Sequence, residues 1–350
     1  SDSYYDLWNT EIHIAIGDLV SLEHHGHPLT LGQFINDVLM VLFFFVVGLE
    51  IKRELVTGEL NTKRAAALPA AAAIGGMVVP ALLYFAFNQS GDAAAGWGIP
   101  MATDIAFAVG VVSLLGTRVS TSLKVFLLTL AIVDDIGAIL VIALFYTEKL
   151  SVGWLIVAIF VVFATSLLRA IKIWYMPVYV ILGLVLWYAI FESGVHATIA
   201  GVIMGLLAPA RPLLDTDDEV EILKMQKINE VESQSLRRLA FQIKETVPVT
   251  ERLQNLLHPL TGFIILPLFA LANAGVSLNA ESIGDAFSSG VTQGIAMGLV
   301  VGKIVGITVF TLLAVKMGLC VLPAGTTPRH VVGIASIAGI GFTVSMFITG

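Results

Sequence analysis

The stretch VFLLTLAIVDDIGAILVIALFY, residues Val125–Tyr146, is largely apolar but carries two adjacent aspartates, Asp134 and Asp135, near its centre. It is long enough to cross a bilayer, which takes about 20 helical residues. Asp104 lies in a second apolar stretch and Lys303 in a third. Four ionisable groups in hydrocarbon cost about 10–14 kcal/mol before any pairing or hydration. Charges retained at that cost indicate a membrane protein that handles an ion.

The composition of the whole chain also indicates a membrane protein. Mean hydropathy is +0.90, 57% of the residues are apolar and 13% are charged, against about 25% in a soluble domain. The single cysteine, Cys320, excludes a disulfide framework and a cysteine-based metal site. The chain opens at Ser1 rather than Met, so we expect it to be a portion of a longer protein.

The apolar pattern predicts an all-α polytopic membrane protein with ten visible spans. The predicted spans are residues 32–58, 65–87, 97–116, 122–147, 152–170, 174–192, 195–210, 252–277, 290–316 and 329–350. With these spans, 17 of the 19 Lys and Arg residues fall in loops on one side. The positive-inside rule makes that side cytoplasmic.

The spans divide the chain into four predicted parts. Residues 1–31 form a periplasmic segment, where the alternation of Ile12, Ile14 and Ile16 predicts a β-hairpin. The other parts are seven spans, a charged cytoplasmic loop and three further spans, over residues 32–210, 211–251 and 252–350.

The adjacent aspartates are the strongest candidate site. Side chains of consecutive helical residues point about 100° apart, so one of Asp134 and Asp135 can face a water-filled cavity while the other faces a neighbouring helix. Their oxygens suit sodium, a hard cation, and carboxylates also bind protons. A site that exchanges the two needs both properties. The alternative is a buried acid pair that fixes helix packing through hydrogen bonds.

Two predicted spans contain signals for an interrupted helix. In GWGIPMATDIAFAVG, Pro100 lacks a backbone donor, and Thr103 with two glycines favours a break just before Asp104. Asp104 could then neutralise exposed helix N-termini. The last span holds IAGIGFT, Ile337–Thr343, which is either a second break or a glycine-rich packing segment. Paired interruptions in distant spans point to a transporter site.

Lys303 is the one basic residue in the predicted spans' interior. It can balance the C-terminal dipoles of broken helices or pair with an acid, and the alternative is snorkelling to an interface. The preceding GLVVGK is not a phosphate loop, since its spacing is one residue short and no Ser or Thr follows. We therefore expect no nucleotide, nucleic acid or cofactor.

Weaker candidates flank the first span. Asp37 near its outer end serves either ion access or helix capping. Glu50, Arg53 and Glu54 at its inner end form either an access funnel or an interfacial cluster. His196 and His258 are interpreted as packed histidines rather than metal ligands, and His258 is also a candidate for a pH-responsive mouth.

Seven strings spread along the chain resemble the NhaA-type sodium/proton antiporters of bacterial inner membranes. They are NDVLMVLFFFVVGLEIKREL (Asn36–Leu55), PMATDIAFAVGV, LTLAIVDDIGAI, SGVHATIAGV, LPLFALANAGVSL, GKIVGI and GIGFTVSMFI (Gly339–Ile348). The resemblance implies an inverted-repeat fold with two discontinuous crossing helices, of whose twelve spans ten are visible here. It also implies electrogenic, pH-dependent exchange of intracellular sodium or lithium for external protons.

The same resemblance assigns roles to particular residues. Asp134 and Asp135 are expected to bind the ion and the proton, with Asp135 the direct cation ligand. Asp104 and Lys303 would stabilise the discontinuous helices, with Thr103 contributing, and Lys303 would pair with Asp134 or exchange a proton. The hairpin before the first visible span is similar to the family's dimer contact, which implies a homodimer in the lipid bilayer.

The chain departs from the family pattern in three places. Two of the family's spans, one at each end, are not visible. Where the family often has a Glu-His pair at its cytoplasmic mouth, this chain has Gln254 and Asn255 while retaining His258. The loop over residues 211–251 is also longer than expected.

Other functions remain open at this point. A sodium-coupled importer of an organic anion would show sodium dependence without proton antiport. An intramembrane protease would place its two aspartates on separate helices, whereas these are adjacent. A non-transporting structural subunit would leave the four intramembrane charges unexplained.

Overall fold

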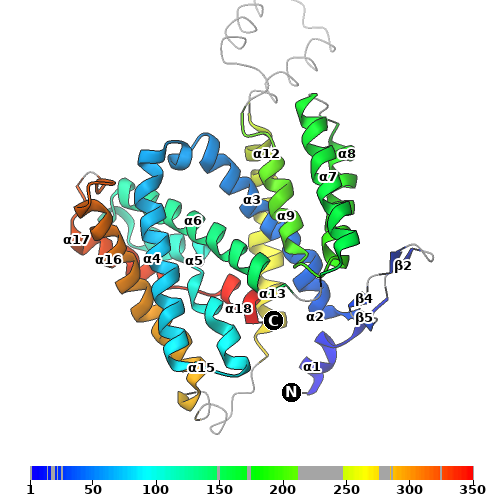
Figure 1. The fold of residues 1–350 in the computed structure, drawn as a ribbon, viewed down its shortest axis with the longest axis horizontal. Helices are drawn as coiled ribbons and strands as arrows, with labels where there is room; N and C mark the ends of the chain where they lie inside the picture. The colour runs from blue at the N-terminus through cyan, green and yellow to red at the C-terminus, as the bar shows by residue number, and fades with distance from the viewer. Residues whose placement is uncertain are drawn as a thin grey trace, which may run out of the picture.

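The computed structural model describes residues 2–349 except 14, 17–19, 22, 25–26, 148–149, 172–174, 212–246, 276–283, 285–286 and 324. The described part is mainly helical (Figure 1). Its α-helices before the 212–246 gap are α1 (Asp2–Trp8), α2 (Leu31–Phe34), α3 (Met40–Val56), α4 (Lys63–Phe87), α5 (Ile105–Leu114), α6 (Thr121–Phe145), α7 (Val152–Ala170), α8 (Met176–Glu192) and α9 (Thr198–Leu207). After the gap come α12 (Val249–Leu260), α13 (Leu266–Asn273), α15 (Gly290–Met297), α16 (Lys303–Lys316), α17 (Pro328–Ala338) and α18 (Thr343–Thr349).

Tighter and wider helical turns join several of these helices. The π-helical turns are η1 (Ile35–Leu39), η5 (Thr261–Ile265) and η6 (Gly298–Gly302), and the 3-10 segments are η2 (Glu59–Asn61), η3 (Asp92–Met101) and η4 (Gly116–Arg118). Each π-turn continues directly into an α-helix, so α2–η1–α3, α12–η5–α13 and α15–η6–α16 are three continuous rods. Such turns frequently occur at functional sites.

The helices have the length and polarity of membrane spans. Within the described residues, six rods or helices are long and apolar enough to cross a bilayer, and the pair η3 and α5, bent by 41°, makes a seventh. Large apolar side chains are widely exposed, as on α7, where Ile159, Phe160 and Phe163 are more than 60% exposed. Water would disfavour such a surface, whereas lipid does not. The chain is therefore an all-α membrane protein.

The structure changes several boundaries of the predicted spans. Residues 97–116 are not one helix, because the helical hydrogen bonding stops between Met101 and Ile105. Residues 329–350 divide at Gly339–Phe342 into α17 and α18, and the predicted span 195–210 is helical only over α9. The predicted loop over residues 211–251 lies almost wholly outside the described residues, which resume at Val247.

Short antiparallel strands lie between α1 and α2. They are β1 (Glu11–Ile12), β2 (Ala15–Ile16), β3 (Val20–Ser21), β4 (Glu23–His24) and β5 (His27–Thr30). β5 pairs with β1 and β4, with Ile12 opposite Leu29, and β2 pairs with β3, with Ile16 opposite Val20. In Figure 1 these strands lie at the edge of the helical body, beside α2.

The N-terminal helix α1 is fastened to the end of α13. The hydroxyl of Tyr4 lies within hydrogen-bond distance of the carbonyl oxygens of Leu271 and Ala272 and donates to one of them at a time, and that of Tyr5 donates to Gly275 O at 2.8 Å. The last carbonyls of a helix lack partners within it. The two tyrosines therefore satisfy the C-terminal end of α13.

A four-residue glycine repeat sets the packing of the α15–η6–α16 rod on α4. Its glycines share one face of the rod and lie against α4 or the residue after it, and Gly298 also meets Pro100 on η3: Gly290, Gly294, Gly298, Gly302 and Gly306. A Cβ built on Gly302 would lie 2.8 Å from the Cα of Pro80, so the two backbones approach too closely for a larger residue. Small residues permit this approach in membranes, where dispersion rather than water drives helix packing. The repeat brings the start of α16 into the middle of the protein.

Candidate functional site

The interruption between η3 and α5 begins at Ala102. Pro100 has no backbone N–H to continue the helical hydrogen bonding, and Ala102 adopts an extended conformation with φ −79° and ψ 142°. Helical structure resumes after Asp104, whose Oδ1 accepts a hydrogen bond from Phe107 N at 3.2 Å. Asp104 is thus the N-cap of α5.

The interruption between α17 and α18 lies against the first one. Asp104 N donates to Ile340 O at 2.8 Å, which joins the two non-helical segments. A Cβ built on Gly341 would lie 2.9 Å from Ala102 O, so glycine permits this approach. Ser345 Oγ on α18 donates to Ile99 O on η3 at 2.8 Å. The two interruptions are therefore held together by both backbone and side chains.

One carboxylate serves both helices that begin at these interruptions. Asp104 Oδ2 accepts hydrogen bonds from Thr343 N at 3.2 Å and Thr343 Oγ1 at 2.8 Å, at the start of α18, while Oδ1 caps α5. Asp104 is 4% exposed. Helix N-termini carry partial positive charge and unpaired N–H groups, both of which favour a carboxylate. The sequence did not single out Thr343, although a threonine directly after Gly-Phe is a helix-start signal.

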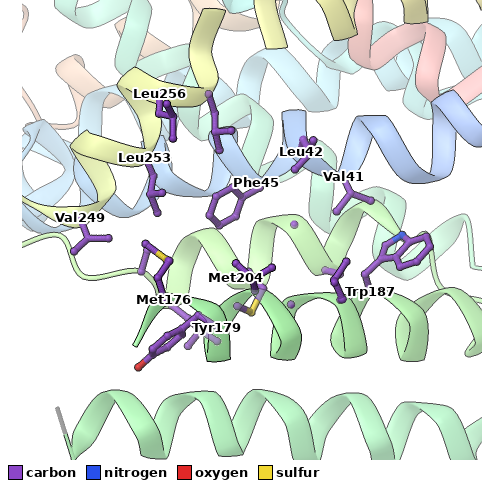
Figure 2. Close-up of a pocket in the computed structure, with 18 of the residues that line it drawn as sticks. Val41, Leu42, Phe45, Met176, Tyr179, Trp187, Met204, Val249, Leu253 and Leu256 are labelled. Atoms are coloured by element: carbon purple, nitrogen blue, oxygen red, sulfur yellow. The ribbon is translucent and has the colours of Figure 1, made fainter. Parts of the chain in front are cut away.

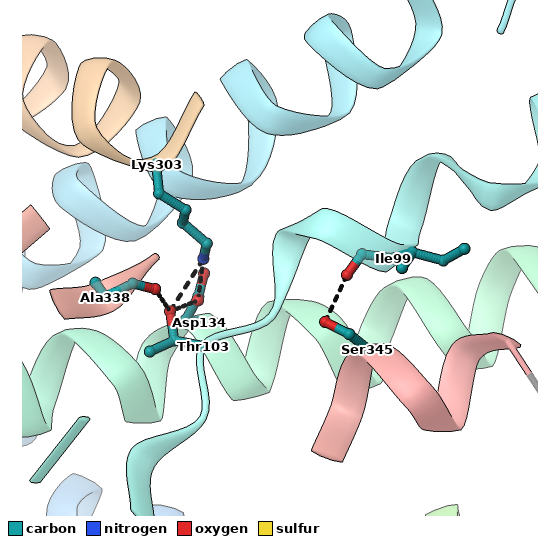
Figure 3. A network of polar contacts seen from close by, with 6 residues as sticks. All are labelled: Ile99, Thr103, Asp134, Lys303, Ala338 and Ser345. Atoms are coloured by element: carbon teal, nitrogen blue, oxygen red, sulfur yellow. Dashed lines mark hydrogen bonds and ion pairs between the residues drawn. The ribbon is translucent and has the colours of Figure 1, made fainter. Parts of the chain in front are cut away.

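Lys303 lies near the C-terminal end of α17, in the network of Figure 3. Its side chain is fully buried and forms an ion pair with Asp134 Oδ2. Lys303 Nζ also donates to Thr103 Oγ1 at 3.1 Å. Thr103 Oγ1 lies 2.8 Å from Ala338 O, one of the last carbonyls of α17. The ammonium group is thus close to a helix C-terminus, where positive charge is favourable.

Thr103 makes more contacts than its single hydrogen can serve. Its hydroxyl oxygen lies 2.7 Å from Asp134 Oδ2 and 2.8 Å from Ala338 O, both of which are acceptors. A hydroxyl has one hydrogen, so it donates to only one of them at a time. Thr103 therefore connects the state of the Lys303–Asp134 pair to the end of α17.

Each of the adjacent aspartates has a buried Oδ1 atom without a partner. Asp134 and Asp135 are 0% and 6% exposed, and their Oδ1 atoms are buried with no hydrogen-bond partner among the described residues. Burying an unpaired carboxylate oxygen is costly. The carboxylates of Asp134, Glu50 and Asp104 repel that of Asp135, and the ammonium group of Lys303 attracts it. The site has an excess of negative charge that a cation or protons can neutralise.

The cluster predicted at the inner end of α3 is arranged through Gln254 of α12. Gln254 Nε2 donates to Glu50 Oε1 at 2.9 Å, and Arg53 donates to Gln254 Oε1 at 3.0 Å. The neutral amide therefore separates Glu50 from Arg53. Glu54 is buried and does not join this chain of bonds.

The other predicted residues lie apart from the aspartate pair. His258 is exposed on α12, so its interpretation as a packed histidine is wrong; α12 turns that face to the surroundings. His196 is half-buried, with its ring 5.5 Å from that of Phe347. Asp37 is half-buried in the π-turn η1, where its carbonyl accepts from Trp187 Nε1 at 2.9 Å.

A cavity of about 1130 Å³ lies between α3, α8, α9 and α12 (Figure 2). Its wall is mainly apolar, with Phe45 and Met204 facing each other across it. None of the predicted site residues lines this cavity. The described part also holds no group of three or more His, Cys, Asp or Glu side chains able to bind a metal. The chemistry is concentrated at the interrupted helices instead.

Buried acids and a buried base at two interrupted helices define a polytopic membrane protein of the ion-handling class. A family model described as Na+/H+ antiporter 1 matches residues 1–350. The chain belongs to this family, whose members are transporters rather than enzymes.

Curated relatives agree along the whole chain. It is 46% identical over 352 residues to the Na(+)/H(+) antiporter NhaA 3 of Frankia alni, covering 100% of this chain and 74% of the relative. The Na(+)/H(+) antiporter NhaA of Rhodopirellula baltica is 46% identical over 360 residues, covering 100% and 79%. That of Helicobacter pylori is 42% identical over 358 residues, covering 99% and 80%.

Proposed function

We propose that this chain exchanges sodium or lithium for protons across the bacterial inner membrane as a multi-pass secondary transporter. The observation that carries the proposal is the Asp134–Asp135 pair, buried beside Lys303 with one unpartnered oxygen on each acid. Oxygen ligands suit a hard cation, and the same carboxylates bind protons. Family membership and the antiporter relatives support the same activity.

Sodium and protons compete for the same carboxylates, and this competition couples the movement of one to that of the other. Sodium approaching Asp135, with the free Oδ1 of Asp134 nearby, displaces protons from the site. Lys303 contributes by pairing with Asp134 when the cation is absent, and it is a second candidate to release a proton. Exchange of more protons than cations makes the cycle electrogenic, and alkaline pH favours it because the carboxylates must lose protons to bind sodium.

Alternating access requires that the site open to each side in turn. We propose an inverted-repeat fold in which η3–α5 and α17–α18 are the two discontinuous crossing helices, with ten of twelve spans present in this chain. Asp104 balances the N-terminal ends of the interrupted helices, and Lys303 with Thr103 balances C-terminal ends. Rocking of one repeat against the other then opens the site to the opposite side of the membrane while the contacts within the site stay formed.

Two surfaces complete the proposal. The N-terminal hairpin, within the periplasmic segment of residues 1–31, forms the contact of a homodimer. Glu50, Arg53, Glu54 and His258 lie near the cytoplasmic access route, and Asp37 near the outer end of the same rod. Gln254 cannot titrate, so this chain's pH response is expected to differ from that of relatives with an acid there.

Proton flux in proteoliposomes of the full-length protein tests the function. A pre-set pH gradient should collapse on addition of sodium or lithium, and not of potassium or choline. Asp135→Asn should abolish sodium-dependent flux while leaving the Lys303–Asp134 pair in place. Near-normal flux in that variant would refute the assignment of Asp135, and no response of the unaltered protein to any cation would favour an organic-anion importer.

A further inference from the structure

A second polar recess lies at the end of α3, away from the aspartate pair. It has a volume of about 430 Å³ and is bounded by the end of α3, η2, the start of α4 and the start of α6. Oxygen-bearing side chains make up much of its wall: Glu54, Thr57, Glu59, Asn61 and Thr62. The space is large enough for roughly a dozen water molecules at about 30 Å³ each.

Glu54 is held facing this recess. It is 8% exposed, and its side chain folds back over Gly58, so that a Cβ built on Gly58 would collide with the carboxylate and lie 2.8 Å from Glu54 Cα. Gly58 has φ −93° and ψ −161°, a conformation open to other residues, so space and not backbone strain demands glycine there. The recess therefore contains one nearly buried carboxylate in a fixed position.

The surroundings of Glu54 favour a positive charge. In the described part of the chain, Glu54 has neither an ion-pair nor a hydrogen-bond partner. It lies in the last turn of α3, where the helix dipole is negative, and one turn after the acid Glu50. Arg53, the base beside it, donates instead to Gln254. A carboxylate in this position is stabilised by a cation from solution.

We propose that this recess binds a hydrated divalent cation of the Mg²⁺ type, separately from the transported ion. Glu54 is the buried ligand, Glu59 supplies the second negative charge at the rim, and Thr57, Asn61 and Thr62 offer neutral oxygens. Mg²⁺ retains several waters and binds through one or two carboxylates, which fits a roomy recess with two acids. By joining the end of α3 to the start of α4, the bound ion stabilises the turn between them.

Thermal unfolding of the purified full chain in detergent tests the site, with Asp135→Asn present to remove the proposed transport ligand. MgCl₂ is compared with NaCl and choline chloride at equal ionic strength. We expect Mg²⁺ to raise the unfolding midpoint saturably and above both controls. Because the readout is stability, this result does not depend on whether the protein transports sodium.

Matched variants locate the effect. Glu54→Gln should abolish the Mg²⁺-dependent rise, whereas Glu251→Gln, an exposed acid on α12, should retain it. Gly58→Ala keeps the carboxylate but displaces it, and should raise the half-saturating Mg²⁺ concentration at least tenfold. An equal response to sodium, no response beyond choline, or a full response in Glu54→Gln would overturn the proposal.

Discussion

Replacing Asp104 with alanine removes a side chain that caps two helices at once. Three hydrogen bonds are lost: from Phe107 N at 3.2 Å, from Thr343 N at 3.2 Å and from Thr343 Oγ1 at 2.8 Å. Loss of a single N-cap costs about 0.5–2 kcal/mol, and each hydrogen bond to a charged group contributes about 1.5–3 kcal/mol. Removing the carboxylate also relieves its repulsion of Asp135. We expect a net loss of about 2–4 kcal/mol in the free energy of unfolding, which is more than one cap and, because of this offset, less than the sum of three hydrogen bonds to a charged group.

Two further substitutions separate capping from general packing. Asp104→Asn retains one good acceptor but lacks the charge and the second carboxylate oxygen, so we expect about half the loss of the alanine variant. Ser345→Ala removes one neutral hydrogen bond between α18 and η3, worth about 0.5–1.5 kcal/mol.

Denaturant titration in mixed detergent micelles, followed by circular dichroism, measures the three differences in free energy. The expected order of destabilisation is Asp104→Ala, then Asp104→Asn, then Ser345→Ala. An alanine variant no less stable than Ser345→Ala would refute the argument, because it would mean that the carboxylate does not satisfy both helix N-termini.

Three further substitutions follow from the same contacts. Lys303→Ala leaves Asp134 buried without its ion-pair partner. This variant should lower the free energy of unfolding by about 3–5 kcal/mol and reduce flux. An unchanged unfolding midpoint would exclude the proposed charge balance. Thr103→Val removes the hydroxyl at nearly constant volume and should lower the free energy of unfolding by about 1–3 kcal/mol. Thr103→Ser retains the hydroxyl and should keep both stability and flux. Equal stability of the valine and serine variants would contradict the bridging role. Gly306→Val should lower the free energy of unfolding by about 1–3 kcal/mol or more, because the added side chain would overpack against Gly75 on α4. Gly333→Val is the control and should be tolerated, because Gly333 has open space around it. Similar unfolding midpoints for the two variants would count against close packing of α4 and α16.

Some features of the site can be read from the sequence because they depend on residue type and local order alone. An ionisable residue in an apolar stretch is visible without coordinates, so Asp104, Asp134, Asp135 and Lys303 stand out at once. Pro100 likewise signals an interruption, because a missing backbone donor acts on its own turn of helix. The glycine repeat from Gly290 to Gly306 is equally visible, but a four-residue period becomes informative only when the facing helix is known.

Long-range pairing could not be predicted from residue types. Asp104 and Thr343 are 239 residues apart, and many other threonines could have supplied the second contact. The assignment of Lys303 to Asp134 rather than Asp135 depends on which face of α6 meets α16, and side chains of adjacent helical residues differ by about 100° in direction. Gln254 shows the same limit, because its contacts with Glu50 and Arg53 exist only where α12 packs on α3.

Residue types along the chain are enough to indicate that this protein lies in a membrane, which residues in its apolar stretches can carry charge, and where two helices can break. Those properties follow from hydrophobicity, ionisation and backbone donors, which each residue brings to any fold. The contacts that bring the two breaks together and pair Lys303 with Asp134 were implied by the family resemblance and not by residue type, and the double cap formed by Asp104 is visible in the folded protein alone. Such contacts arise where distant segments pack closely. A small shift or rotation of one helix would give each charge a different partner, so residue types alone do not specify the pairing.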